Sequence, residues 1–226
     1  MRAGSFLVAG DMATTRLAEI GRSTAARLAR NPVVQPVQGE GITLYCVQNF
    51  LAPEECGGLI AMINADRKPS GLLSASQDPE FRTSESCDLD RWHPFVDGID
   101  RRICDLMAMK PRLGETLQGQ RYAVGQQFKG HHDYFHVSES YWQTEKKRGG
   151  QRSWTAMIYL DEPESGGETL FSAAGLKVTP RAAMLLAWNN MDKKGAPNPN
   201  AFHESLPVIT GQKNIVTKWF RERFWV

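Results

Sequence analysis

Apolar positions follow two different patterns along the chain, and the change falls near residue 118. Before it, apolar residues recur three or four positions apart, which is the spacing of one buried helix face. Two stretches show this spacing: Ala13, Leu17, Ile20 and Leu28, with the polar Thr24 among them, and Val96, Ile99, Ile103, Leu106 and Met107. After it, short apolar runs are separated by Gly-Gly, Pro and Asn clusters. The sequence therefore predicts helices first and short strands afterwards.

The first part of the chain is predicted to contain helices with a strand between them. The N-terminal stripe predicts an amphipathic helix, followed by a connector, within residues 1–40. Pro53 with two glutamates after it is typical of a helix first turn, because proline loses no hydrogen bond there and acids suit the dipole. The remaining expectations are a strand over 42–50, a loop or irregular strand pair over 66–92, and a helix over 94–109 with His93 just before it.

The second part reads as a series of short strands. They are expected at Arg121–Val124, Trp154–Leu160, Leu176–Val178, Ala183–Trp188 and Asn214–Phe220. Short strands at such spacing are typical of a β-sandwich or barrel. We therefore predict an α+β fold, helices first and then a jelly roll, with residues 41–226 as a single domain. The polar stretch 136–151 is expected to be a loop, either a lid over a site or a flexible insertion.

Composition narrows the function classes. The chain has 226 residues and a net charge of +2 with both signs interspersed, so nothing favours nucleic acid or an anionic membrane as partner. No apolar run approaches the ~18 residues that cross a bilayer. The four cysteines show no CxxC spacing and are expected to be thiols in a reducing, cytoplasmic compartment. Asp11 and Glu19 interrupt the Arg-rich start, which favours a packed helix over a targeting peptide.

The candidate chemistry begins with His131 and Asp133. They lie two residues apart at a predicted strand, and because strand side chains alternate, they project from the same face while His132 points away. A histidine from a distant strand would complete two histidines and one carboxylate, a facial set typical of non-haem Fe(II) oxygenases. His203 is the best candidate. Alone, an HxD pair is weak evidence, because surface histidines beside acids are common.

A downstream segment strengthens this hypothesis. Lys213 follows His203 by ten residues, and Pro207 and Gly211 indicate a turn between two strands. The two side chains are therefore expected to face one cavity from neighbouring strands. A buried ammonium there would pair with the carboxylate of a small dicarboxylic acid bound to the metal. The alternative for any single lysine is a solvated surface position.

Three segments together carry a family resemblance. Residues 121–133 (RYAVGQQFKGHHD), 159–171 (YLDEPESGGETLF) and 203–213 (HESLPVITGQK) are similar to the core of the prolyl 4-hydroxylase family of 2-oxoglutarate-dependent dioxygenases. Residues 50–60 and the triplet Arg82-Thr83-Ser84 resemble its first part more weakly, so the similarity covers about 42–222. It implies a double-stranded β-helix (jelly roll) core with N-terminal helices packed on one sheet.

The resemblance also implies the site residues and cofactors. It assigns iron binding to His131, Asp133 and His203, and 2-oxoglutarate binding to Lys213, Tyr122 and Thr155. Lys213 would hold the far carboxylate of the cosubstrate, with Tyr122 beside it and Thr155 on the same pocket wall. No catalytic residue is expected beyond the Fe(II) centre, and ascorbate is a further cofactor that the family suggests. The chain departs from the family pattern at Glu204, Ser205 and Asn214, which are expected near the mouth of the site.

The predicted function is that of an Fe(II)- and 2-oxoglutarate-dependent dioxygenase that hydroxylates a prolyl residue of a protein or peptide and releases succinate and CO2. Arg82, Arg91, Tyr141 and Trp142 are candidates for substrate contact, whereas Trp188 and Trp219 are expected in the core. Three alternatives stay open: the same chemistry on another side chain, the same chemistry on a small molecule, and a non-catalytic metal-binding jelly-roll module. A zinc hydrolase and a nucleic-acid demethylase are less favoured, because the sequence shows neither an obvious general base nor a basic aromatic patch.

Overall fold

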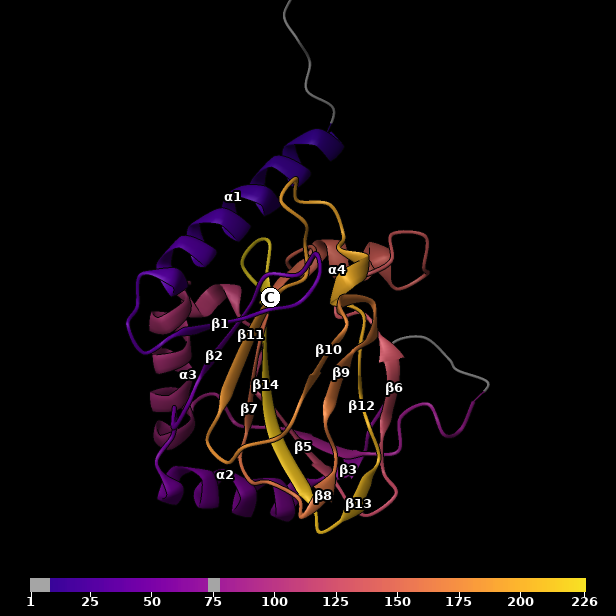
Figure 1. Ribbon diagram of the computed structural model, residues 1–226. Helices are drawn as coiled ribbons and strands as arrows, with labels where there is room; N and C mark the ends of the chain where they lie inside the picture. The colour runs from indigo at the N-terminus through magenta and orange to yellow at the C-terminus, as the bar shows by residue number, and fades with distance from the viewer. Residues whose placement is uncertain (1–8, 73–77) are drawn as a thin grey trace, which may run out of the picture.

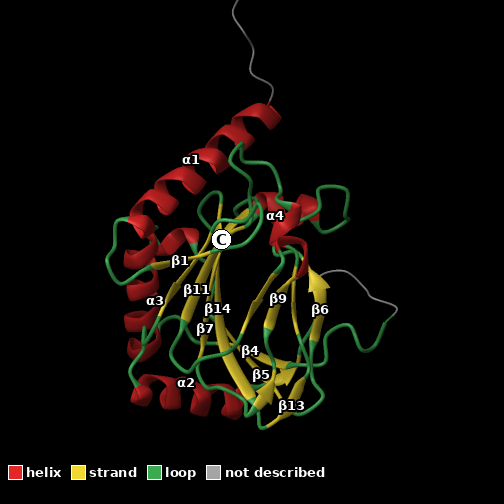
Figure 2. Cartoon of the chain, in the orientation of Figure 1, coloured by secondary structure: helices red, strands yellow, loops and turns green. Residues whose placement is uncertain are grey.

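The computed structural model describes residues 9–72 and 78–226, and for residues 9–13 the backbone alone. The helices are α1 Ala9–Ala29, α2 Pro53–Asp66, α3 Pro94–Met107 and α4 Trp142–Lys147. The three longer helices α1, α2 and α3 run along one side of a large antiparallel sheet, and a smaller sheet faces its other side (Figures 1 and 2). Single 3₁₀ turns lie at Pro111–Leu113, Ser172–Ala174 and Pro199–Ala201. None of the helices described is long and apolar enough to cross a membrane.

The large sheet has eight strands, all paired antiparallel. In spatial order they are β1 Gln35–Val37, β2 Leu44–Val47, β11 Leu185–Asn189, β7 Arg152–Tyr159, β14 Lys213–Arg221, β5 Gln118–Tyr122, β4 Glu85–Asp88 and β3 Lys68–Pro69. The four-stranded sheet is β10 Leu176–Val178, β9 Thr169–Phe171, β12 His203–Ser205 and β6 Phe128–His131. A separate pair joins β13 Val208–Thr210 to β8 Ser165–Gly166.

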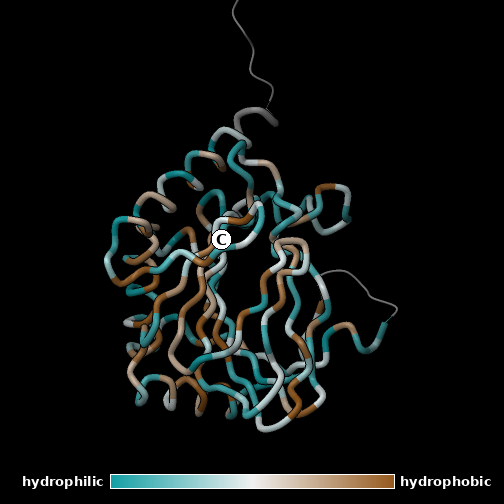
Figure 3. The backbone as a smooth tube through the Cα atoms, in the orientation of Figure 1, coloured by the Kyte–Doolittle hydropathy of each residue, from teal (hydrophilic) through white to brown (hydrophobic). Residues whose placement is uncertain are grey.

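The two faces of the large sheet bury different hydrophobic clusters, and alternation along β7 shows why. Trp154 and Ile158 belong to the cluster shared with the helices, whereas Met157 and Tyr159 belong to the cluster that includes Phe171 of the smaller sheet. Hydrophobic segments are accordingly concentrated along the strands of both sheets (Figure 3). The second face, between the sheets, is the one that carries the candidate site.

Most of the predicted elements are confirmed. Leu17, Thr24 and Leu28 of the N-terminal stripe are buried and Ile20 is half-buried, while the side chain of Ala13 lies outside the described residues. Each predicted strand corresponds to one in the sheets, and the 66–92 stretch contains the pair β3–β4. His93 caps α3, because its Nδ1 accepts from the backbone N–H of Phe95. The four cysteines are buried free thiols.

The stretch 136–151 is more ordered than predicted. It contains helix α4, and the buried Glu145 of that helix forms an ion pair with the buried Arg221 of β14. Gly149 and Gly150, at the end of the stretch, have positive φ angles of 122° and 77° and are themselves buried. A six-residue helix has little stability of its own, so this tertiary ion pair explains why no sequence pattern revealed it.

Candidate active site

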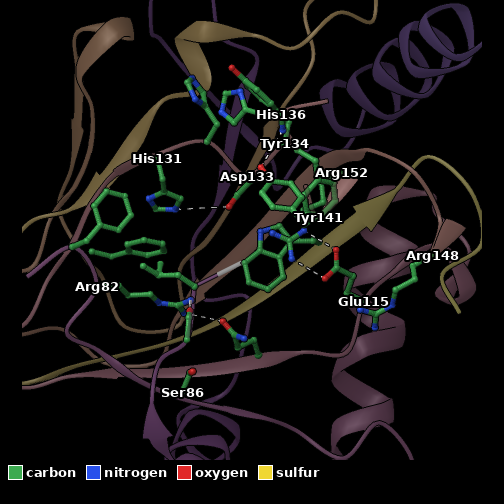
Figure 4. Close-up of a pocket in the computed structure, with 18 of the residues that line it drawn as sticks. Arg82, Ser86, Glu115, His131, Asp133, Tyr134, His136, Tyr141, Arg148 and Arg152 are labelled. Atoms are coloured by element: carbon green, nitrogen blue, oxygen red, sulfur yellow. Dashed lines mark hydrogen bonds and ion pairs between the residues drawn. The ribbon is translucent and has the colours of Figure 1, made fainter. Parts of the chain in front are cut away.

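His131, Asp133 and His203 converge between the two sheets. His131 ends β6 and His203 begins β12, and the two residues are direct partners across these antiparallel strands. Asp133 follows in the turn after β6, with Oδ1 3.9 Å from His131 Nε2 and Oδ2 3.9 Å from His203 Nε2. Figure 4 shows His131 and Asp133 side by side. The candidate ligand atoms of the three residues all lie within 4.8 Å of one another.

Backbone carbonyls fix which nitrogen each histidine presents. Nδ1 of His131 lies 2.9 Å from Lys129 O, and Nδ1 of His203 lies 2.9 Å from Ala201 O. Because a carbonyl only accepts, Nδ1 carries the hydrogen in both rings and Nε2 keeps its lone pair. Burial and the neighbouring His203 lower the pKa of His131 to about 3, so this ring is a neutral ligand at physiological pH.

Asp133 is held from the large sheet. The Thr155 hydroxyl donates to Asp133 Oδ2 over 2.7 Å, and Asn190 Nδ2 donates to the Thr155 oxygen over 2.9 Å. Burial works to raise the pKa of Asp133, but the neighbouring His203, His131 and Arg152 outweigh it and leave the pKa below its ordinary value. Asp133 is therefore an ionised carboxylate. Thr155 differs from its prediction, since it supports this carboxylate and does not line the inner cavity described below.

The donor set fits an iron ion. Two imidazole nitrogens and one carboxylate oxygen, all oriented by hydrogen bonds, form the facial set that suits non-haem Fe(II) and leaves further coordination positions open. Within the described residues, this is the one group of three or more histidine, cysteine or acidic side chains with such spacing. His132 lies outside it, as alternation predicted: its Nε2 is 3.3 Å from Pro199 O and its ring stacks on Tyr134.

A narrow inner cavity of about 40 Å³ leads from the triad to Lys213. Lys213 is 1% exposed, and it lies directly across from Tyr122 in the β14–β5 pairing, with Nζ 4.4 Å from the centre of the tyrosine ring. Its ammonium donates to Gly167 O over 2.7 Å and contacts the Ser205 hydroxyl. Burial lowers its pKa to about 7, although Glu168 and Asp161 act in the opposite direction.

This lysine forms no ion pair with any carboxylate of the described chain. A buried ammonium whose partners are neutral oxygens is an unfavourable arrangement unless an anion joins it. The inner cavity provides the space for that anion between the triad and the ammonium. The sequence predicted Tyr122 and Lys213 in one pocket with the triad, and both line the inner cavity.

Two departures from the family pattern do not lie where the sequence suggested. Ser205 lines the inner cavity and touches the Lys213 ammonium, so it stands at the deep end of the site and not at its mouth. Asn214 is fully buried, with its backbone N–H and its side-chain amide each 2.6 Å from a carboxylate oxygen of Asp161. It braces the loop after β7 and lines neither the inner cavity nor the outer one.

A larger outer cavity of about 790 Å³ opens beside the triad (Figure 4). Both cavities are lined by Phe128, His131, Asp133 and Trp219, so they meet at the triad. Arg82 and Arg152 lie on the wall of the outer cavity. The Arg82 guanidinium packs 4.6 Å from the centre of the Phe128 ring, and Arg152 lies 4.0 Å from that of Trp219. Tyr141 also lines this cavity, as suggested for the 136–151 stretch.

A buried ion-pair network supports that wall. Glu115 binds Arg152 through two hydrogen bonds of 2.6 and 2.8 Å and pairs with Arg221 at 2.5 Å, and Arg221 pairs in turn with Glu145 of α4. These residues come from four separate segments, and no spacing in the sequence links them.

Sequence reasoning missed Trp219, which it assigned to the core. Trp188 is buried in the core, as expected, and it lines the inner cavity as well. A signal was nevertheless present. Counting in twos along β14 from Lys213 gives Ile215, Thr217 and Trp219, and all four line the inner cavity. The same rule on β5 adds Gln120 to Tyr122.

Comparisons with known proteins agree with this geometry. Residues 117–221 match the model of the 2OG-Fe(II) oxygenase superfamily. The chain is 34% identical over 200 residues to probable prolyl 4-hydroxylase 8 of Arabidopsis thaliana, a match that covers 78% of this chain and 67% of the relative. Prolyl 4-hydroxylase 5 of the same plant is 34% identical over 196 residues, with 76% and 66% covered. The chain thus spans about two thirds of the length of these relatives.

Solved structures resemble the fold as well. The viral collagen prolyl hydroxylase of Paramecium Bursaria Chlorella virus-1, in its 2OG complex, superposes with a TM-score of 0.63 at 26% identity, covering 79% of this chain and 95% of that one. A Pseudomonas putida prolyl-4-hydroxylase shares the fold, with a TM-score of 0.56 at 18% identity and coverage of 89% and 99%. The chain belongs to the prolyl 4-hydroxylase family of Fe(II)- and 2-oxoglutarate-dependent dioxygenases.

Proposed function

We propose that this protein hydroxylates a prolyl residue within a protein or peptide. In this proposal His131, Asp133 and His203 hold Fe(II), and Lys213 holds the far carboxylate of 2-oxoglutarate. The observation that carries the proposal is the buried Lys213 ammonium without a carboxylate partner among the described residues, at the far end of a cavity that begins at the triad. Iron and 2-oxoglutarate, when bound, supply an oxidation by O2 that converts the cosubstrate to succinate and CO2 and hydroxylates the substrate.

The side chains of the protein have positioning roles. Nδ1 of each histidine and Oδ2 of Asp133 are engaged in hydrogen bonds, so Nε2 of each ring and Oδ1 of Asp133 are the atoms that would hold the metal. Lys213 fixes the cosubstrate at its other end, with the Tyr122 ring against the ammonium. Tyr122 is fully buried and burial raises its pKa, so it acts as a neutral hydroxyl.

The outer cavity is the proposed substrate channel. It meets the inner cavity at the triad, and its lining combines aromatic rings with the arginines Arg82 and Arg152. Aromatic faces pack against pyrrolidine rings, and guanidinium groups donate to the backbone carbonyls of an extended chain. A volume of about 790 Å³ exceeds that of a single amino-acid residue, so the cavity has room for a prolyl residue together with its neighbours in a peptide.

We further infer that the two facing sheets are the halves of a double-stranded β-helix, or jelly roll. Residues 41–226 would form the catalytic domain, and the described residues before them would be a helix and its connector. The antiparallel pairing in both sheets supports this description. So does the repeated crossing of the chain between the sheets, from β5 to β6, from β6 to β7 and from β12 through β13 to β14.

Anaerobic binding of Fe(II) and 2-oxoglutarate, followed by exposure to O2 with a panel of proline-containing peptides, tests the proposal. We expect succinate release that depends on the peptide, and a gain of one oxygen atom located on proline by fragment mass spectra. Peptides with alanine in place of proline serve as the control. Succinate with the oxygen on another residue would assign the chemistry to a different side chain. Absence of 2-oxoglutarate binding in the iron-loaded protein would contradict the enzyme altogether.

A further inference from the structure

A row of indole and guanidinium groups continues from the outer cavity onto the protein surface. Trp225 and Arg148 line the cavity, with the Arg148 guanidinium carbon 5.9 Å from the centre of the Trp225 ring. Arg91 lies 5.4 Å from the same ring and 5.7 Å from that of Trp92. The order Arg148, Trp225, Arg91, Trp92 therefore leads away from the cavity, and we refer to these four residues as the indole–guanidinium row.

The outermost member is both exposed and held in place. Trp92 is 83% exposed, the highest value among the large apolar side chains described. Its backbone N–H donates to Asp90 Oδ1 over 2.9 Å, and the N–H of His93 donates to Asp90 O over 3.1 Å, so the residue sits on a defined turn just before α3. Trp225 is anchored as well, because its N–H donates to Arg112 O over 2.8 Å. An exposed indole on a hydrogen-bonded turn is the kind of group that serves as a docking anchor.

The chemistry of the row fits a proline-rich chain. Such a chain offers carbonyl acceptors but few N–H donors, and in the polyproline II conformation it presents pyrrolidine rings that pack on aromatic faces. Arg91 makes no ion pair or side-chain hydrogen bond that would occupy its guanidinium within the described chain, so its five donors remain for carbonyl oxygens.

Charge alone does not select the ligand of this row. Arg91 and Arg148 contribute positive charge, but Asp88 lines the same cavity and Asp90 forms the turn under Trp92, while Glu145 pairs with Arg148 at 3.5 Å. The mixed signs give no net field that would attract a strongly acidic chain. Indole faces and hydrogen-bond donors therefore define the recognition.

We propose that the indole–guanidinium row is a second docking site for the peptidyl substrate, and that it holds a proline-rich segment at a distance from the prolyl residue in the active site. The inference rests on the proposed function, because it assigns the outer cavity to the same substrate. The row lies outside the reacting centre, so it acts on the affinity for long substrates. It does not change the turnover rate once the substrate is bound.

Peptides of two kinds test the proposal. A short peptide carries one reactive proline, and longer peptides add a proline-rich arm, an acidic arm or a Gly-Ser arm on either side. The wild-type protein is compared with Trp92→Ala, Arg91→Lys and Ile209→Ala, the last being a matched control because Ile209 is 67% exposed and lies on β13, away from the row. Two readouts are taken: kcat and KM for hydroxylation, and fluorescence anisotropy of the labelled long peptide.

The wild type is expected to favour the proline-rich arm. Trp92→Ala should raise KM and the dissociation constant for that peptide by at least about fivefold, the loss that separates contributing from neutral interface residues. It should change neither kcat nor the KM for the short peptide. Arg91→Lys should have a smaller effect in the same direction, because lysine keeps the charge but not the planar face. Ile209→Ala should behave as the wild type.

Several results would overturn the proposal. The first is that the wild-type protein has the same KM for the short peptide and for the peptide with the proline-rich arm. The second is that Trp92→Ala raises KM equally for both peptides. The third is that an acidic or a Gly-Ser arm improves affinity as much as the proline-rich arm. The proposed function is judged separately. If binding of the long peptide depends on Trp92 but no peptide gains hydroxyproline, the docking site is supported and prolyl hydroxylation is refuted. If proline is hydroxylated equally well with and without Trp92, prolyl hydroxylation is supported and the docking site is refuted.

Discussion

The Thr155 hydroxyl lies 2.7 Å from Asp133 Oδ2 and donates a hydrogen bond to it, which ties the carboxylate after β6 to strand β7 of the opposite sheet. Replacing Thr155 by Val removes this donor and keeps the shape of the side chain. We expect the affinity for Fe(II) to fall by about tenfold or more, the usual cost of losing a group that orients a metal ligand. Anaerobic metal titration measures this effect. Unchanged iron affinity together with weaker 2-oxoglutarate binding would instead support the original prediction that Thr155 lines the 2-oxoglutarate pocket.

Lys213→Ala should impair binding of the cosubstrate but not binding of the metal. The substitution removes the buried cation but none of the three proposed ligands, which lie at the other end of the inner cavity. We expect 2-oxoglutarate affinity to fall strongly while iron content stays nearly intact. Calorimetric titration of the iron-loaded variant, with iron measured in parallel, checks both parts. An unaltered 2-oxoglutarate titration would exclude the proposed role of Lys213.

Binding of 2-oxoglutarate should depend on pH near neutrality. Burial lowers the pKa of Lys213 to about 7, against the opposing charges of Glu168 and Asp161. Above that pH the free protein holds a neutral amine and must take up a proton to bind the dicarboxylate. The affinity should therefore weaken as pH rises from 7 to 9, by up to about tenfold per pH unit. Calorimetry in two buffers of different ionisation enthalpy should detect this proton uptake, and its absence would contradict the prediction.

Ser205→Gly should alter which oxo-acid the site accepts. The Ser205 hydroxyl contacts the Lys213 ammonium at the deep end of the inner cavity, so glycine removes a polar partner and adds space. We expect 2-oxoglutarate affinity to fall by about tenfold, as for a hydrogen bond to a charged group, and 2-oxoadipate, longer by one methylene, to bind better. Ser205→Ala, which keeps the Cβ atom, should show the first effect with less of the second. Unchanged discrimination in both variants would show that Ser205 does not limit cosubstrate length.

Glu115→Gln should destabilise the fold. Glu115 is buried between Arg152 and Arg221, and removing one partner of a buried ion pair costs about 3–5 kcal/mol. Burial works to raise the pKa of Glu115, but the two arginines outweigh it and keep the pKa below its ordinary 4.5. The wild type therefore holds this contribution above pH 4.5 and loses it on further acidification, whereas the variant lacks it throughout.

Denaturant unfolding at several pH values measures this difference. Glu162→Gln is the control, because Glu162 forms an exposed pair with Arg181 at 3.6 Å and such pairs contribute about 0–1 kcal/mol. Equal losses in the two variants would contradict the role of the buried network.

The parts of the site that follow from local rules were predictable. Alternation along a strand distinguishes His131 from its neighbour His132, and the turn signals between His203 and Lys213 indicate two strands that face one cavity. The position of Asp133 depends on more than alternation. The strand ends at His131, and the hydrogen bond from Thr155 holds the carboxylate in the turn beyond it.

The parts that depend on contacts between distant segments were not predictable. Glu115, Glu145, Arg152 and Arg221 become a network only when β14, α4 and the start of β7 meet, and each residue alone resembles an ordinary surface charge. The same holds for Ser205, whose importance arises from contact with Lys213 eight positions later. Tertiary pairing, which leaves no periodic signal in a single sequence, decides these cases.

One consequence concerns the ten-residue spacing from His203 to Lys213. The chain leaves β12, forms β13, turns at Gly211 with a φ angle of 86° and enters β14 with Lys213 as its first residue. The number of residues in this stretch therefore fixes the distance between the proposed metal ligand His203 and the Lys213 ammonium. Because strand side chains alternate, inserting one residue before Lys213 would aim the ammonium at the helix-facing side of the sheet. The length of this segment is therefore tied to the length of the dicarboxylate that would fit between the metal and the ammonium.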